Sequence, residues 1–352
     1  MTDVVPEHWR RVALDPPRAY GEPVAQGSLR ISVEDFEVYE ELPFEPDGHG
    51  AHWLLRVVKR GANTEWVAGQ LARLAGVRAA DIGFAGLKDR HALTSQWFSV
   101  PQSTLTADAW LAVEHPEYRV LEAYLHGRKL RRGALAANRF RICVRQLHAD
   151  AQALQARVAK VAGLGVPNYF GVQRFGREGA NLARVHRWSA TGSLPGSRSE
   201  RSFTLSAARS LLFNAVLAER VDNGTWDTLL PGDVANLEGS GSIFAVAELT
   251  PDLAERCRAR DIHPTGPLWG AGEVRASAGV RALENAVGTR FDSVVALLGA
   301  VGLKQERRPL RLRVADLKAQ VDEAALTLEF RLGAGAFATT VLRELLQPIT
   351  EA

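Results

Sequence analysis

A short charged segment between two apolar runs constrains the fold more than any other part of the sequence. One run ends at Phe84 and the second spans Trp97 to Val100, and both have the composition of β-strands. Between them lies Asp89, with Lys88 and Arg90 on either side. Connections between strands are where reactive side chains are usually presented, and a carboxylate can act as a nucleophile. The segment therefore predicts a reactive aspartate, although a surface turn with a local ion pair would have the same pattern.

The bulk composition is that of an ordinary globular protein. A chain of 352 residues exceeds the size of one common hydrophobic core, so we expect two domains, or one domain with a large insertion. The two cysteines, Cys143 and Cys257, are far apart, which excludes a disulfide framework and a cysteine-based zinc site. Met1 to Arg11 lack the apolar part of a secretory signal, and the apolar run at 293–303 is too short to cross a membrane. These features predict a cytoplasmic protein.

No segment predicts a bound metal ion, nucleotide or flavin. His49 and His52 are close in sequence, but no carboxylate or thiol lies at ligand spacing from them. The glycines of 239–242 and 270–272 lack the strand-then-helix pattern of a phosphate-binding loop. We therefore expect no metal and no cofactor.

Positive charge is concentrated in one segment, although the chain as a whole carries little of it. The 43 basic and 40 acidic residues give a net charge of +3, with a pI near 9.0. Seven cations lie within 128–145 with no acid among them: Arg128, Lys129, Arg131, Arg132, Arg139, Arg141 and Arg145. From Asn138 onward the residues alternate as in a strand, with apolar side chains facing inward and arginines outward. A row of outward-facing arginines can bind the phosphate backbone of a nucleic acid. The alternative is a basic strand at the edge of a sheet that is simply exposed to solvent.

Local patterns predict several further elements. Helices are expected from Asn63 or Thr64 to Gly76, over 206–221 and over 338–346. A strand is expected at 326–332, and a loop at 192–202, which is rich in glycine, proline, serine and arginine.

The segment from Gly83 to Trp97 resembles the catalytic motif of the TruD family of tRNA pseudouridine synthases, G-[FY]-A-G-x-K-D-x-x-A-x-T-x-Q-W. Further segments of the family pattern occur along almost the whole chain, at 34–36, 63–64, 128–140, 166–176, 266–270 and 335–339. The resemblance implies an α+β fold: a pseudouridine-synthase-type catalytic domain, with a mixed, mainly antiparallel sheet and flanking helices, interrupted by an α/β insertion domain. It places the catalytic domain at 1–164 and 304–352 and the family-specific insertion (TRUD) domain at 165–303.

The resemblance also implies an activity, the conversion of a uridine in tRNA, uridine 13, into pseudouridine. No cofactor and no protein partner are implied, and the family precedent is a monomer. The expected nucleophile is Asp89, which could attack C1′ of the ribose, add to C6 of the base or remove the 2′ proton, and the sequence does not choose among these. Because a stacked base is out of reach of such a carboxylate, we expect the uridine to be flipped out of the RNA.

The resemblance to the family also implies which residues contact the substrate. The expected substrate contacts are Phe36, Asn138, Phe140, Phe337, Arg30 and Lys88. The strand pattern over 29–40 slips at Glu34-Asp35, which would turn Phe36 out of the core, where a phenylalanine is otherwise more common. Arg30 stands where the family usually has lysine, and the two side chains differ in shape and reach. For RNA binding we expect the seven cations of 128–145 and Arg174, which lies among aromatic residues that can stack on bases.

Two other functions fit parts of the pattern. A non-catalytic RNA-binding or tRNA-folding protein would use the same basic face without isomerising uridine. A hydrolase built on Asp89 and His91 fits poorly, because no nucleophile elbow, paired carboxylates or metal-ligand spacing accompanies these residues.

Overall fold

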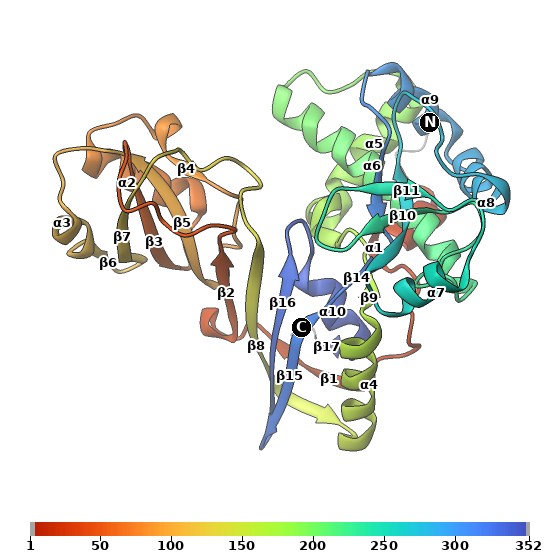
Figure 1. Cartoon of the computed structure of the whole chain (residues 1–352), viewed down its shortest axis with the longest axis horizontal. Coiled ribbons are helices and arrows are strands. Elements are labelled where there is room, and N and C mark those ends of the chain that lie inside the picture. The colour runs from red at the N-terminus through yellow and green to blue at the C-terminus, as the bar shows by residue number, and fades with distance from the viewer. Residues whose placement is uncertain (1–3, 350–352) are drawn as a thin grey trace. The chain divides into compact units, whose positions relative to one another are not determined.

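The structure, a computed structural model, describes residues 4–349. These residues form two compact units, each built from segments that are distant in the sequence (Figure 1). Unit 1 contains the described residues up to Pro23, then Ala159–Arg313 and Ala336–Leu345. Unit 2 contains Val24–Val158, Val314–Gly335 and the described residues from Leu346 onward. The division into catalytic and insertion domains is a functional one and stays a prediction.

Unit 2 is organised around a mixed sheet. Its main path runs β15-β16-β8-β2-β5-β3-β7-β6, and β1, β17 and β4 pair beside this path. The β2–β5 and β1–β17 pairs are parallel, and the other pairs are antiparallel. The strands are β1 (Ala25–Leu29), β2 (Phe36–Glu41), β3 (His52–Arg60), β4 (Gly83–Phe84), β5 (Leu93–Pro101), β6 (Glu114–His115), β7 (Tyr118–His126), β8 (Ala137–Ala149), β15 (Ala315–Asp322), β16 (Ala325–Gly333) and β17 (Leu346–Pro348).

The long strand β8 has the alternation that the sequence predicts. Its buried residues include Phe140, Ile142 and Val144, and its exposed residues include Arg139, Arg141 and Arg145. It pairs with β2 on one side and β16 on the other. The alternative of a basic edge strand is therefore wrong.

The irregularity predicted at Glu34-Asp35 is a short 3-10 turn, Val33–Asp35, which separates β1 from β2. The turn changes the direction of the chain without exposing the aromatic residue that follows it. Phe36 is only 5% exposed, so the slip does not turn it out to solvent in the free protein.

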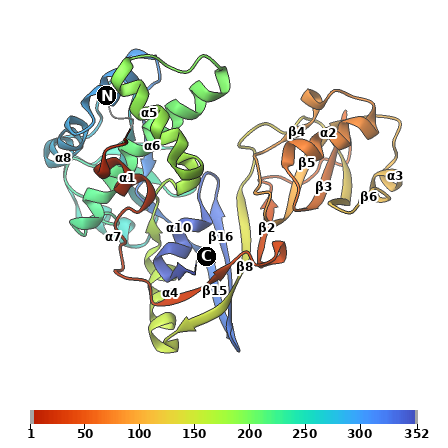
Figure 2. The same ribbon diagram turned by 180° about the vertical axis from the view of Figure 1, so that it is seen from behind.

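Helix α2 (Thr64–Ala75) packs on β3, β5 and β7 (Figures 1 and 2). It begins after Asn63 and ends at Gly76, as predicted, and the φ of 68° at Gly76 is a left-handed conformation that glycine adopts without a Cβ clash. Val67 and Leu71 are fully buried in the core beneath it. Each such side chain contributes about 1.5–3 kcal/mol to the stability of the unit. The short helix α3 (Ala107–Leu111) lies before β6.

Unit 1 is organised around the long helix α6 (Arg198–Asp222), whose apolar residues pack with α1, α5 and α9. Figure 2 shows α1 lying against α6. A four-stranded sheet of order β11-β10-β12-β13 and the pair β14–β9 complete the unit. The elements are α1 (Glu7–Leu14), β9 (Val166–Pro167), α5 (Ala180–Thr191), β10 (Val234–Leu237), β11 (Ile243–Ala245), α7 (Pro251–Arg258), β12 (Ile262–Leu268), α8 (Ala278–Thr289), α9 (Asp292–Ala300), β13 (Glu306–Pro309), β14 (Arg311–Leu312) and α10 (Ala338–Leu345). The α4 helix (Ala151–Leu164) begins in unit 2 and ends in unit 1.

Helix α6 begins earlier than the sequence pattern predicts. The expected loop over 192–202 ends at Ser197, which caps the helix: its Oγ accepts a hydrogen bond from Glu200 N at 3.2 Å and donates one to Glu200 Oε2 at 2.8 Å. The predictions of a strand at 326–332 and a helix at 338–346 are confirmed by β16 and α10. The mixed α+β class is also confirmed.

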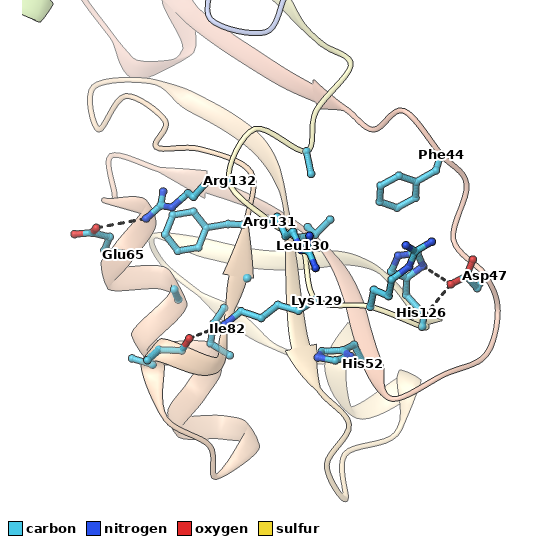
Figure 3. A pocket seen from close by; sticks show the side chains of 18 residues that line it. Phe44, Asp47, His52, Glu65, Ile82, His126, Lys129, Leu130, Arg131 and Arg132 are labelled. Carbon is cyan, nitrogen blue, oxygen red and sulfur yellow. Dashed lines mark hydrogen bonds and ion pairs between the residues drawn. The ribbon is translucent and has the colours of Figure 1, made fainter. Parts of the chain in front are cut away.

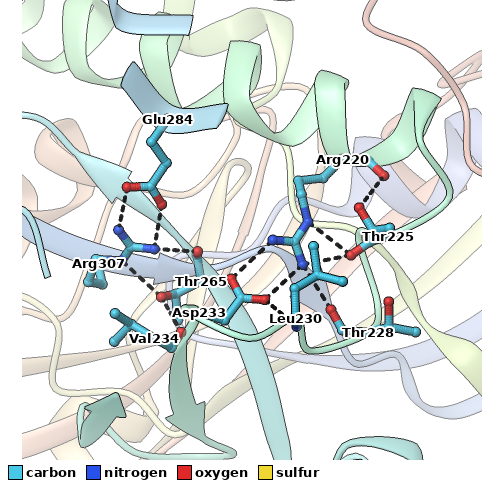
Figure 4. A network of polar contacts seen from close by, with 9 residues as sticks. All are labelled: Arg220, Thr225, Thr228, Leu230, Asp233, Val234, Thr265, Glu284 and Arg307. Atoms are coloured by element: carbon cyan, nitrogen blue, oxygen red, sulfur yellow. Dashed lines mark hydrogen bonds and ion pairs between the residues drawn. The ribbon is translucent and has the colours of Figure 1, made fainter. Parts of the chain in front are cut away.

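Two buried arginine–carboxylate pairs stabilise the interior of unit 1 (Figure 4). Arg220 lies 3.0 Å from each oxygen of Asp233 and also donates to two backbone carbonyls, of Thr225 and Thr228. Arg307 makes two similar bonds to Glu284, at 2.7 and 3.0 Å. These side chains are at most 2% exposed, and removing one partner would leave a buried charge unpaired.

A helix that crosses a bilayer needs about 20 predominantly apolar residues. Within residues 4–349, no helix combines sufficient length with sufficient apolar character to cross a membrane.

Candidate active site

Asp89 lies in the connection between β4 and β5, where the sequence places it. Its Oδ2 is 2.7 Å from Arg30 Nη2, and its Oδ1 accepts a hydrogen bond from His91 N at 3.0 Å. The Asp89 side chain is 25% exposed and that of Arg30 is 29% exposed. The carboxylate is therefore held in one orientation by two donors while part of it is open to an incoming substrate.

A buried lysine, Lys59, holds the backbone of the loop that carries Asp89. Lys59 is fully buried on β3, and its Nζ donates to Asp89 O at 2.9 Å and to Ala62 O at 2.8 Å. Burial lowers the pKa of Lys59 to about 8, against a smaller opposing effect of Asp89. Because one ammonium contacts both the loop and the turn before α2, the position of Asp89 depends on packing elsewhere in unit 2.

A second set of buried polar contacts orders the residues just before Asp89. Thr64 Oγ1 accepts a hydrogen bond from Lys88 N at 3.0 Å and donates one to Gln96 Oε1 at 3.0 Å. Gln96 Nε2 in turn donates to Gly86 O at 2.6 Å. Both side chains come from elements that flank the loop, and their fully paired polar atoms make the loop rigid.

Arg30 connects the aspartate to an aromatic cluster. Its guanidinium lies 4.4 Å from the centroid of the Phe36 ring, within cation–π range. Phe36 meets the edge of Phe140, and Phe140 stacks on Phe330. Arg30 also has a φ of 62°, which is uncommon for a residue other than glycine and costs about 1–2 kcal/mol. Such strain is typical of functional sites.

Asn138 lies on β8 two residues before Phe140, so both side chains point to the same face of the sheet. Its Oδ1 is buried and has no hydrogen-bond partner among the described residues. A buried acceptor without a donor costs about 1–3 kcal/mol, and a ligand that supplied an N–H group would recover this energy.

Lys88 is directed into the protein interior. Its ammonium pairs with Glu40 of β2, and both side chains are almost completely buried. Burial raises the pKa of Glu40, and the attraction of Lys88 opposes this effect. The predicted role of Lys88 in substrate binding stays a prediction, since in the free protein its charge is paired internally.

Sequence reasoning did not select four residues that hold the loop: Glu40, Lys59, Thr64 and Gln96. Thr64 is the first residue of α2. The other three share a signal, polar character within strands that are otherwise buried, such as Lys59 at the end of β3 and Gln96 in the middle of β5. Polar groups in such positions need specific partners, which makes them candidates for a structural or functional role.

Phe337 and Arg174 belong to unit 1. Phe337 lies 6.2 Å from Phe170, ring to ring, and the Arg174 guanidinium lies within 6 Å of both rings. Arg174 Nη1 donates to Ser206 Oγ at 2.9 Å, and burial lowers its pKa. A second arginine, Arg308, lies over Phe170 at 4.2 Å, and burial lowers its pKa to about 10. The predicted meeting of Phe337 with Asp89 at one substrate stays a prediction.

The arginines of β8 have acidic partners that come from distant parts of the chain. Arg139 pairs with Glu41, Arg141 with Glu37 and Glu329, and Arg145 with Asp35. The segment contains no acid of its own, but acids on β2, on β16 and in the turn before β2 partly compensate the charge of these arginines. The other predicted RNA contacts of this segment, Arg128 to Arg132, line a separate hollow.

Residues 4–349 contain no group of three or more histidine, cysteine, aspartate or glutamate side chains that could hold a metal ion. Cys143 and Cys257 are free thiols.

Comparisons with known proteins agree with this architecture. A crystal structure from Methanosarcina mazei, assigned provisionally to tRNA pseudouridine synthase D (TruD), superposes with a TM-score of 0.72. The match covers 97% of this chain and 98% of that one, at 22% identity. Proteins named tRNA pseudouridine synthase D are more similar in sequence. That of Nitrosococcus oceani is 49% identical over 334 residues, or 94% of this chain and 93% of the relative. That of Azotobacter vinelandii is 48% identical over 332 residues.

The fold and these relatives define the class of protein, an isomerase of the pseudouridine synthase type. The model of the family described as tRNA pseudouridine synthase D (TruD) matches residues 18–188 and 188–345. The chain therefore belongs to the TruD family, as the resemblance of its motifs indicates.

Proposed function

We propose that this chain converts a uridine of tRNA, uridine 13, into pseudouridine and that the Asp89 carboxylate carries the reaction. The observation that supports this most directly is the Asp89–Arg30 pair at 2.7 Å, next to the Phe36–Phe140 aromatic pair. The arrangement offers an anionic nucleophile, a cation that orients it and a surface on which a base can stack. No cofactor or protein partner is needed, and we expect a cytoplasmic monomer.

The reaction breaks the bond between C1′ and N1 of the uridine and joins C1′ to C5. N1 gains a proton and C5 loses one to solvent, so the product is an isomer and no oxidant or reductant is needed. Asp89 would serve by attack on C1′, by addition to C6 or by removal of the 2′ proton, and all three routes require the same contact with the nucleoside.

For that contact the uridine has to leave the RNA stack. We propose that it is flipped out and stacks near Phe36 and Phe140, while Asn138 Oδ1 accepts a hydrogen bond from N3–H of the base. The acceptor on Asn138 supports this assignment, because it has no donor among the described residues and N3–H of uracil would supply one. Arg30, which covers Phe36 in the free protein, would move with the base or stack on it.

The test is the Asp89→Asn variant, assayed by release of tritium from tRNA that carries 5-³H-uridine. We expect turnover to fall by about 10⁴-fold or more, because an amide is not a nucleophile. The Kd for tRNA should change less than about fivefold, since a partly exposed ion pair contributes at most about 1 kcal/mol.

The matched control is Asp81→Asn, which also removes a carboxylate from a pair with an arginine, Arg78, on the surface of unit 2. It should retain wild-type turnover. Near-normal tritium release from Asp89→Asn would show that Asp89 does not take part in the reaction. If the wild-type protein binds tRNA but releases no tritium, it is a non-catalytic tRNA-binding protein.

A further inference from the structure

Unit 2 contains a large open hollow of about 1230 Å³ beside the segment that connects β7 to β8 (Figure 3). Its walls come from the connection after β2, from α2, from β4 and from residues 126–134. None of the predicted catalytic or substrate contacts of unit 2 lines it. Pockets for small molecules occupy roughly 300–1,000 Å³, so this hollow is larger than one small ligand requires.

The segment that borders the hollow is held firmly in place. Leu130 is buried, and its N–H donates to Ser99 Oγ at 2.8 Å. Lys129 Nζ donates to Ala80 O at 2.6 Å, and Gly133 N donates to Ala85 O at 2.7 Å. Because the backbone is fixed on both sides of Leu130, the neighbouring cations are held at the hollow with little further loss of backbone entropy on binding.

The lining has an excess of positive charge. Four cations, Arg128, Lys129, Arg131 and Arg132, face two carboxylates, Asp47 and Glu65, which leaves a formal charge of +2. Among the described residues, Arg128 and Arg131 form no hydrogen bond and no close ion pair, although the charge of Arg128 is near enough to Asp47 to help lower the pKa of that carboxyl. The arginines of β8 differ, since each of them already pairs with an acid. Within 128–145, the cations that remain available for an anion are therefore Arg128 and Arg131, both at the hollow.

The same lining contains aromatic rings and a buried polar atom without a partner. Phe44 stacks on His126, with ring centroids 4.9 Å apart, and Phe84 carries the Arg132 guanidinium 4.0 Å from its centroid. His52 Nδ1 is buried and has no hydrogen-bond partner in the described part of the chain. Cations beside aromatic faces and an unused polar atom are the features with which proteins bind unpaired RNA bases and their phosphates.

The start of α2 links one wall of the hollow to the active-site loop. Glu65 lines the hollow, and the residue before it, Thr64, accepts a hydrogen bond from Lys88 N, next to Asp89. The hollow and the proposed nucleophile therefore share a structural support within unit 2.

We propose that this hollow binds nucleotides of the tRNA that adjoin the target uridine. Arg128 and Arg131 contact their phosphates, and Phe44 and the Arg132 guanidinium that covers Phe84 contact a base that is not paired. This inference rests on the proposed function, because it takes the RNA at Asp89 as its starting point.

The test reverses the two available charges, in the double variant Arg128→Glu/Arg131→Glu. We expect the KM and Kd for tRNA to rise by about tenfold or more, and kcat to stay within about twofold of the wild-type value, because binding energy is lost away from the reacting atoms. The slope of log Kd against log salt concentration should fall in magnitude by about 2, which corresponds to two lost phosphate contacts.

The control is Arg73→Glu/Arg119→Glu, which reverses two exposed arginines of the same unit outside the hollow. It should have a KM and a salt slope near those of the wild type. Photocrosslinking of 4-thiouridine-labelled tRNA to the wild-type protein gives a second readout, and we expect crosslinked peptides that contain Phe44 or Phe84. Equal effects of the two double variants, or crosslinks that avoid both peptides, would overturn the proposal. A wild-type protein that binds tRNA without releasing tritium would instead contradict the proposed function.

Discussion

At the scale of single residues, Lys59 shows how an interior charge affects both the site and the stability. Its pKa of about 8 lies below the 10.5 of an exposed lysine, because burial disfavours the charged form. Between these two values the unfolded chain binds more protons than the folded one. The contribution of Lys59 to the free energy of unfolding should therefore rise as the pH increases from about 8 to 10.5.

The Lys59→Met variant tests this contribution. The increase in stability that Lys59 adds between pH 7.5 and 9.5 should disappear, and kcat should fall because the Asp89 carbonyl loses its donor. Urea denaturation at the two pH values measures the first effect and tritium release the second. Lys318→Met, at an exposed lysine of β15, is the control and should follow the wild type in both. The same pH dependence in wild type and Lys59→Met would contradict the assignment.

Residue-level prediction from the sequence succeeded where the signal is local. The loop position of Asp89 and the inward and outward residues of β8 follow from neighbours in the chain. The partners of charged groups do not. Arg141 and Glu37 are 104 positions apart and meet only because β2 and β8 pair in register. The contact between Lys59 and Asp89 was not predicted for the same reason, because the two residues are 30 positions apart and meet only in the folded unit.

At the scale of elements, the pair of Arg220 on α6 and Asp233 before β10 should contribute strongly to unit 1. In Asp233→Ala the guanidinium would stay buried without its counterion, and we expect the free energy of unfolding to fall by about 3–5 kcal/mol. Glu219→Ala is a matched control on the same helix, because Glu219 pairs with Arg290 at the surface. The Glu219→Ala variant should lower the free energy of unfolding, measured by chemical denaturation, by less than about 1 kcal/mol. If the free energy of unfolding falls by a similar amount in both variants, burial does not determine how much an ion pair contributes to stability.

Element boundaries were predictable where a residue signals them directly. Gly76 ends α2, as predicted from its place after the last apolar residue of the helical pattern. The start of α6 was missed because its first turns carry charged and polar residues, and only the bonds between Ser197 and Glu200 mark the cap. Strand order also lay beyond the sequence, since β8 is flanked by β2 and by β16, which come from opposite ends of the chain.

At the scale of the whole molecule, the last part of the chain completes both units. In unit 2, β16 pairs with β8 from Leu326 to Gly333 and buries Leu328 and Phe330. In unit 1, α10 supplies Glu344, whose Oε2 accepts hydrogen bonds from the backbone N–H groups of Ala19 and Tyr20, 3.1 and 3.3 Å away. Neither unit can therefore close its core from the residues before 314 alone.

This arrangement predicts that a chain ending at Arg313 does not fold. Without β16, the buried face of β8 and one of its two rows of backbone hydrogen bonds are exposed, and unit 1 loses the apolar face of α10 with Val341, Leu342 and Leu345. We expect no cooperative thermal transition by circular dichroism or tryptophan fluorescence. A chain ending at Ile349 keeps every described element and should unfold at the wild-type Tm. A cooperative transition in the shorter chain would show that one unit folds without the C-terminal segment, and hydrogen exchange would identify which, because only a folded unit protects the amides of β3 or of α6.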